Sequence, residues 1–177
     1  MNGKREQARK ECEALVATLE IPEPFDLQSL CHRVGEMRGR AVVLMPTAMT
    51  FGNLCGLWLA TARTDYVFYE KHTTVLHQRH IVFHELGHIL RGHVASRTLG
   101  ADIARALTSA IEPGQMDRVL GRDSYTDDQE REAELIGTLI LKRVSRLHSV
   151  DTPSAVDPAA GGAIARIARS LSRGDRS

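Results

Sequence analysis

Apolar and polar residues follow a helical period in some segments of this chain and form short apolar runs in others. From Lys4 to Leu19, apolar residues recur every three or four positions while charged residues fill the other side, which predicts an amphipathic helix. Pro22 and Pro24 end this helix. Asp26 is then a suitable cap for a second helix, which carries its apolar residues on one face and has Gly35 near its end.

The period changes in the next segment, where the residues are β-branched or aromatic. Three short runs predict strands: Arg40 to Met45, which Pro46 stops, Leu54 to Ala60, and Tyr66 to Tyr69. Thr61 to Asp65 has the composition of a turn. Strands this short, with tight connections, favour a small antiparallel three-stranded sheet. Helices before and after such a sheet give an α+β fold.

A longer helix is predicted directly after the sheet, from Val75 to Arg91. Thr73 or Thr74 can cap its start, Gly92 stands where it would end, and the segment contains no proline. At about 100° per residue, its apolar residues fall on one arc, which predicts the face that packs against the core. The opposite face carries a stripe of histidines: His77, His84 and His88.

This stripe contains an HExxH pattern, formed by His84, Glu85 and His88. Two histidines four residues apart lie one above the other on a helix and can bind one metal ion, and Glu85 points to the side, where it can accept a proton from a metal-bound water. The alternative is an ordinary amphipathic helix with a histidine-rich polar face. His93 lies one position short of the third histidine in the longer HExxHxxGxxH pattern, so we interpret it as a neighbour of the site.

The last strong helical pattern runs from about Asp127 to Leu147. Thr126 or Asp127 can cap it, and Gln129 or Glu130 three residues later would complete a capping box. Its apolar residues form one broad sector, as expected of a helix that packs against the rest of the domain.

Glu132 lies inside that apolar sector, where a negative charge is costly unless a positive group meets it. A metal ion would meet this requirement, and so would an arginine or the start of another helix. Ala133 and Gly137 lie on or beside the same sector, and their small size would permit another helix to approach closely.

The remaining segments carry weaker patterns. Ala101 to Ile111 has the spacing of a further helix, ended by Pro113 and Gly114. We predict one domain over residues 1–148. Residues 149–177, rich in proline, glycine, alanine and serine, form a linker and a C-terminal tail that contains a short amphipathic pattern.

Composition narrows the class of protein. The chain has 177 residues, of which 42% are hydrophobic and 25% charged, and these fractions are ordinary for one globular domain. A net charge of only +1 gives no basic field for direct binding to nucleic acid. The chain has no apolar run of membrane-spanning length and no signal-peptide core, so we expect a cytoplasmic protein. The three cysteines, Cys12, Cys31 and Cys55, are expected to be reduced thiols.

Two helices, a small sheet, the string QRHIVFHELGHILRGH and then EREAELIG on a later helix make the chain similar to the ImmA/IrrE family of zinc metallo-endopeptidases. The resemblance covers roughly residues 20 to 147. It implies a zincin-like fold in which Zn²⁺ is held by His84, His88 and Glu132, with Glu85 as the general base. The chain departs from the family's usual residues after Ala133, at Glu134, Ile136 and Gly137.

The resemblance also implies a substrate. Characterised members of the family act on transcriptional repressors of the helix-turn-helix type, so the expected function is a zinc-dependent endopeptidase that cleaves a separately encoded regulator. Two other functions stay open: a non-catalytic protein that binds such a regulator, and the toxin component of a two-gene module. For an enzyme, Tyr125, His80 and Arg91 are candidates for stabilising an oxyanion.

Overall fold

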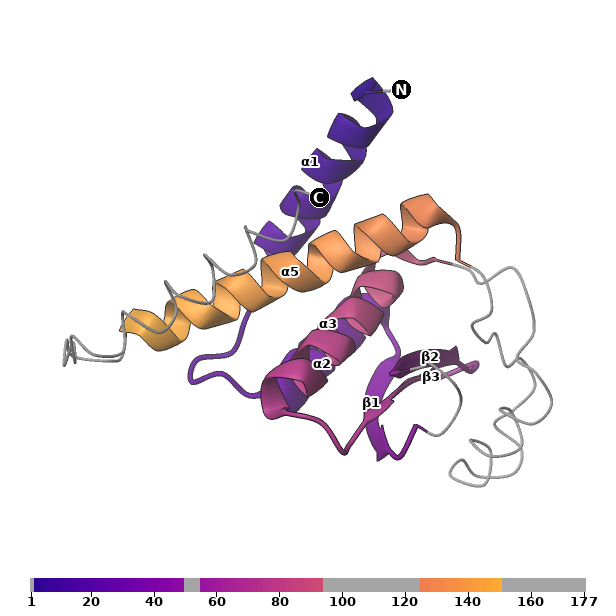
Figure 1. The fold of residues 1–177 in the computed structure, drawn as a ribbon, viewed down its shortest axis with the longest axis vertical. Helices are drawn as coiled ribbons and strands as arrows, with labels where there is room; N and C mark the ends of the chain where they lie inside the picture. Colours follow the sequence, from indigo (N-terminus) through magenta and orange to yellow (C-terminus); the bar gives the residue numbers. More distant parts are fainter. Residues whose placement is uncertain (1, 50–54, 94–124, 151–177) are drawn as a thin grey trace, which may run out of the picture. The chain divides into compact units, whose positions relative to one another are not determined.

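A computed structural model describes residues 2–49, 55–93 and 125–150 of this protein (Figure 1). The described residues form four helices and three strands in an α+β arrangement. The helices are α1 (Asn2–Thr18), α2 (Leu27–Arg38), α3 (Val75–Arg91) and α5 (Asp127–Val150), and the strands are β1 (Ala41–Thr47), β2 (Gly56–Ala60) and β3 (Thr64–Glu70). By its contacts the chain divides into residues 1–147 and 148–177. The predicted helix at Ala101–Ile111 and the predicted tail helix lie outside the described residues.

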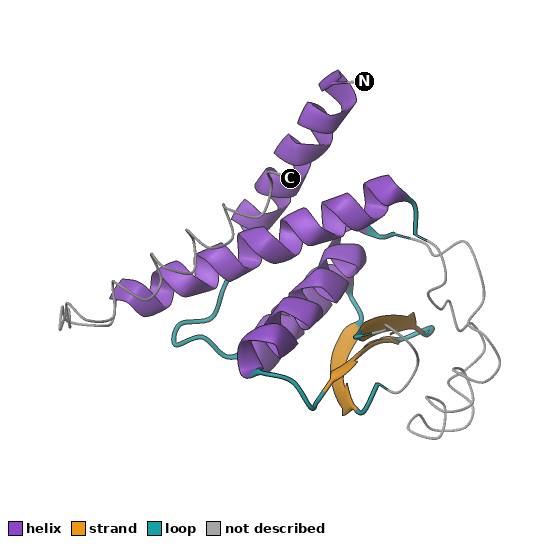
Figure 2. Ribbon diagram, in the orientation of Figure 1, coloured by secondary structure: helices purple, strands orange, loops and turns teal. Residues whose placement is uncertain are grey.

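The three strands form a mixed sheet in the order β1-β3-β2, drawn in orange in Figure 2. β2 and β3 are antiparallel, as expected of strands joined by a tight turn, but β1 pairs parallel to β3. The predicted all-antiparallel sheet was therefore wrong. Successive strands alternate in direction in the predicted sheet and in the observed one. Only the order of the strands differs, and the observed order places β1 beside β3, which runs in the same direction. Because β1 is an edge strand, Pro46 is tolerated inside it and does not stop it.

The predicted helix ends are largely confirmed. In α3 the Thr74 side chain accepts a hydrogen bond from the His77 N–H, and Gly92 closes the helix with a φ of 62°. At the start of α5, the Thr126 N–H donates to Gln129 Oε1 and the Gln129 N–H donates to the Thr126 hydroxyl, which is the reciprocal bonding of a capping box. α2 starts after Asp26 as predicted, but it runs past Gly35 and ends at Gly39.

The core lies where α3 packs against the sheet on one side and against α5 on another. The contact between α3 and α5 is made by backbone. A Cβ on Gly87 would lie 2.7 Å from the carbonyl oxygen of Ala133, and a Cβ on Gly137 would lie 3.2 Å from the backbone nitrogen of His84. The prediction that small residues on the last helix permit close approach is consistent with this contact. The HExxH segment is thereby fixed against the start of α5.

A buried ion-pair group, which we name the Asp65 cluster, joins the sheet to the end of α2. The Asp65 carboxylate is fully buried, and its Oδ1 accepts a hydrogen bond of 3.1 Å from the Trp58 indole and lies 3.3 Å from Arg40 Nη2. Its Oδ2 lies 4.0 Å from Arg38 Nε, and Arg40 also donates to the Thr61 carbonyl. The two guanidinium groups compensate the burial of this negative charge.

Over the described parts of the chain, the length and hydropathy of the helices do not meet what a transmembrane span requires.

Candidate metal centre

Three side chains, which we name the ligand group, converge between α3 and α5: His84, His88 and Glu130. The two Nε2 atoms of the histidines lie 3.1 Å apart. Glu130 Oε2 lies 3.3 Å from His84 Nε2 and 3.8 Å from His88 Nε2. His88 is fully buried, whereas His84 and Glu130 are partly exposed, so the group lies at the edge of the core. Its three ligand atoms could all bind one metal ion.

Two of the three expected ligands are therefore brought together, but the third place is taken by Glu130 where the sequence analysis named Glu132. Glu132 Oε2 instead lies 2.6 Å from Arg91 Nε and 3.2 Å from His93 Nε2. This position matches the alternative of a glutamate paired with an arginine. The role of Glu132 as a direct ligand stays a prediction that the geometry does not favour.

The reason lies in which part of the α5 surface faces α3. With Glu132 at zero on a helical wheel, Ala133, Gly137 and Glu130 fall at about 100°, 140° and 160°. Ala133 and Gly137 are the residues in backbone contact with α3. The histidine stripe of α3 lies at the edge of this backbone contact. The carboxylate that faces the stripe is therefore Glu130, at the edge of the apolar sector of α5, and not Glu132, which lies inside the sector. The small residues were the signal that could have identified Glu130.

His93, just after α3, connects the ligand group to Glu132. Its Nδ1 lies 3.0 Å from His88 Nδ1, and its Nε2 faces the Glu132 carboxylate. Burial lowers the pKa of His93, although the Glu132 carboxylate opposes this shift. The hydrogen bond with Glu132 raises the pKa of Arg91, which therefore stays cationic. His93 does not belong to the ligand group, in agreement with its interpretation as a neighbour.

Two further side chains contact the histidines of the ligand group: Glu134 lies against His84, and Tyr125 lies against His88. Glu134 Oε2 lies 3.5 Å from His84 Nδ1 and 3.6 Å from His80 Nε2. The Tyr125 ring stacks on the His88 ring with 3.8 Å between centroids. Arg91, a candidate for oxyanion stabilisation, is instead paired with Glu132 and Glu11. Tyr125 and His80 remain candidates for that role.

Glu85, the expected general base, is buried on α3 beside the start of β2. A Cβ on Gly56 would lie 2.7 Å from Glu85 Oε1 and 2.5 Å from a methyl group of Ile81. The absence of a side chain at Gly56 thus leaves room for the carboxylate. Any larger residue there would displace Glu85 from its present position.

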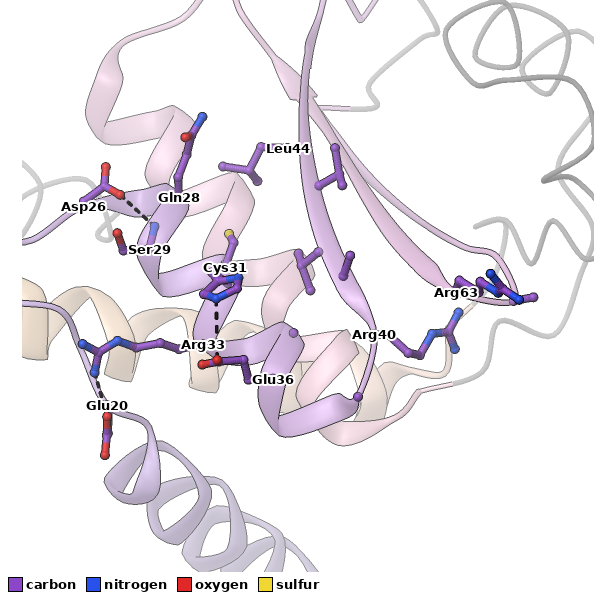
Figure 3. Close-up of a pocket in the computed structure, with 17 residues that line it drawn as sticks. Glu20, Asp26, Gln28, Ser29, Cys31, Arg33, Glu36, Arg40, Leu44 and Arg63 are labelled. Carbon is purple, nitrogen blue, oxygen red and sulfur yellow. Dashed lines mark hydrogen bonds and ion pairs between the residues drawn. The ribbon is translucent and has the colours of Figure 1, made fainter.

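A hollow of about 1330 Å³ lies elsewhere, along α2 and β1 (Figure 3). Its charged lining is mixed in sign: Glu20, Asp26, Arg33, Glu36, Arg40 and Arg63. Several of these charges are already paired, as Arg33 is with Glu20 at 2.8 Å. Neither Glu85 nor any member of the ligand group lines this hollow, so it does not extend the candidate centre.

No protein-family model matches the chain, and no curated protein or solved structure matches it closely enough to show a family.

Proposed function

We propose that this protein is a zinc-dependent endopeptidase in which His84, His88 and Glu130 hold the metal. The observation that carries the proposal is the convergence of two imidazole nitrogens and a carboxylate between α5 and the helix that also carries Glu85. In a tetrahedral zinc site with bonds of about 2.0 to 2.1 Å, neighbouring ligand atoms are about 3.3 to 3.4 Å apart. The separations of 3.1, 3.3 and 3.8 Å within the ligand group fit that spacing.

Among the residues that the structure describes, the ligand group has three members, the number that is typical of a catalytic zinc site. Structural zinc sites have four protein ligands, whereas hydrolytic sites have three and leave a position for water. When bound in such a site, zinc lowers the pKa of a coordinated water to about 7 and polarises the carbonyl of a substrate. A structural site would have no use for a neighbouring carboxylate such as Glu85.

Each residue of the chain has a separate part in the proposed reaction. His84, His88 and Glu130 hold and orient the ion, and Glu85 accepts the proton of the attacking water as general base. The substrate class that follows from the sequence resemblance is a protein, in particular a separately encoded helix-turn-helix regulator in the cytoplasm. A non-catalytic regulator-binding protein, or the toxin of a two-gene module, would be the alternative.

The test compares the wild type with Glu85→Gln, which keeps the size of the side chain and removes its basicity. We expect both proteins to bind one zinc per chain by elemental analysis, and proteolysis to fall about 10²- to 10⁴-fold in the variant. Proteolysis is measured as new N-termini in an extract of the source organism. If zinc-loaded wild type produces no new N-termini beyond those of the variant, the proposal of an enzyme is overturned. The alternative of a non-catalytic regulator-binding protein then remains.

A further inference from the structure

The side of His88 that faces away from the ligand group is held by a chain of three side chains. His88 Nδ1 lies 3.0 Å from His93 Nδ1, His93 Nε2 lies 3.2 Å from Glu132 Oε2, and Arg91 Nε lies 2.6 Å from the same oxygen. All three contacts are within hydrogen-bonding distance. His88 is fully buried and His93 nearly so, so the contact between these two rings is poorly accessible to competing water.

The carboxylate at the end of this chain determines where the protons lie. Glu132 accepts hydrogen bonds, and therefore favours a proton on His93 Nε2. In a neutral imidazole the other nitrogen, His93 Nδ1, is then an acceptor, so that His88 must donate from its own Nδ1. This leaves the lone pair of His88 on Nε2, which is the atom that faces His84 and Glu130.

We propose that His93, oriented by Glu132, is a positioning residue that fixes the ring and the tautomer of His88 for metal binding. The proposal rests on the proposed metal site of His84, His88 and Glu130. Metal-binding histidines commonly donate their second N–H to a carboxylate or other acceptor, and loss of that acceptor weakens metal binding. Here the acceptor is a second histidine, and the carboxylate acts through it.

Two glutamates of α5 thus have different parts although they are only two residues apart. Residues two apart on a helix point about 200° away from each other. Glu130 faces the Nε2 atoms of the ligand group, whereas Glu132 faces the far side of His93 and is also neutralised by Arg91. The Arg91 guanidinium lies 2.6 Å from the same Glu132 oxygen that faces His93 and compensates its negative charge.

The experiment measures the dissociation constant of zinc by competition with a chromophoric chelator. His93→Phe keeps a ring and removes both nitrogens, and we expect it to weaken zinc binding about 10- to 100-fold. His93→Asn can place an acceptor near the former Nδ1 and should recover part of that loss, which a merely space-filling role would not predict. His32→Phe is the matched control, because His32 is exposed on α2, and it should bind zinc as the wild type does.

Two glutamine variants separate the ligand from the residue behind it. Glu130→Gln should lose more zinc affinity than any other variant, whereas Glu132→Gln, which still offers an oxygen to His93, should lose less than His93→Phe. The double variant His93→Phe with Glu132→Gln should bind zinc no more weakly than His93→Phe alone, because both changes act on one hydrogen-bonded chain.

The outcomes distinguish the two proposals. If the wild type binds no zinc, the metal site and this inference both fail. If the wild type binds zinc and His93→Phe binds it equally well, only the positioning role fails. If Glu132→Gln loses as much affinity as Glu130→Gln, Glu132 is itself a ligand and the inference is overturned. Should His93→Phe not fold, His93→Asn and Glu132→Gln decide the question.

Discussion

Two groups of charged side chains are built into this domain, and they differ in how their charges balance. In the Asp65 cluster one buried carboxylate lies between two guanidinium groups and accepts a hydrogen bond from Trp58. Among the described residues between α3 and α5, the carboxylates of Glu130, Glu132 and Glu134 face four histidines (His80, His84, His88 and His93), and Arg91 pairs with Glu132. In the first arrangement two positive groups outnumber the single carboxylate, so no further cation is needed there. The second gathers electron-pair donors and negative charge, which suits the binding of a cation.

The comparison indicates that burial of a charge does not by itself mark a functional site. Asp65 is more completely buried than Glu130, and two guanidinium groups lie beside it, although its Oδ2 accepts no hydrogen bond among the described residues. Glu130 is partly exposed, and its place opposite two imidazole nitrogens is what makes it a candidate. The first two predictions below test whether the Asp65 cluster serves stability and the ligand group serves binding, and the third tests the burial of the Cys31 thiol.

The largest effect is expected for loss of a carboxylate from the Asp65 cluster. Asp65→Ala leaves two guanidinium groups close together without their shared partner, and we expect it to lower the free energy of unfolding by about 3 to 5 kcal/mol. Glu130→Ala removes a carboxylate from the ligand group and should change the stability of metal-free protein by only about 0.5 kcal/mol. Urea unfolding in the presence of a chelator measures both. If the two variants lose the same free energy of unfolding, the Asp65 cluster and the ligand group do not differ in their contribution to stability.

A smaller effect is expected where the contact between α3 and α5 is tightened. In Gly87→Ala the new Cβ would lie 2.7 to 2.8 Å from backbone atoms of Ala133, so the helices must shift, at a cost of about 1 to 3 kcal/mol. Zinc affinity should fall as well, because the ligand group draws on both helices. The control is Gly3→Ala on α1, which meets nothing within 4 Å and should be neutral or stabilising by about 0.5 to 1 kcal/mol.

Unchanged zinc affinity in a folded Gly87→Ala protein would mean that the spacing of the two helices does not control the ligand group. Calorimetric titration of zinc, together with urea unfolding, gives both quantities from the same preparations.

The smallest effect, about 1.4 kcal/mol between pH 9 and pH 10, concerns the Cys31 thiol on α2. Burial raises the pKa of Cys31 from 9.0 to about 12, so the folded state keeps a proton that the unfolded state releases. The stabilisation is complete below pH 9 and declines as pH rises towards 12, by about 1.4 kcal/mol per pH unit. Urea unfolding at a series of pH values should show a shallower decline in Cys31→Ala. An identical slope in the two proteins would assign the alkaline loss to other groups.

The part of the site that is local in sequence was predictable. The length and caps of α3 follow from Thr74 and Gly92, and the joint position of His84 and His88 follows from the helical repeat alone. The choice between Glu130 and Glu132 was not predictable from a hydrophobic sector, because it depends on how α5 is rotated against α3. That rotation is set by the backbone contacts of Ala133 and Gly137.

The fold shows the same division. The starts of α2 and α3 were predicted correctly, because their capping residues directly precede them in sequence. The β2–β3 hairpin was predicted from the turn that joins its strands. The position of β1 beside β3 depends on pairing between residues such as Ala41 and Thr64, which are far apart in sequence. His93 was expected near the site, five residues after His88, but its contact with Glu132 is non-local and was not predicted.

Main-chain atoms of α5 rest directly on Gly87, and those of α3 lie against Gly137. At these two positions backbone meets backbone, so the approach of the helices is limited there by atomic radii, while apolar side chains such as Phe83 and Ile136 fill the core beside them. Exchange of one surface side chain for another on either helix should therefore leave the separation of the two backbones unchanged.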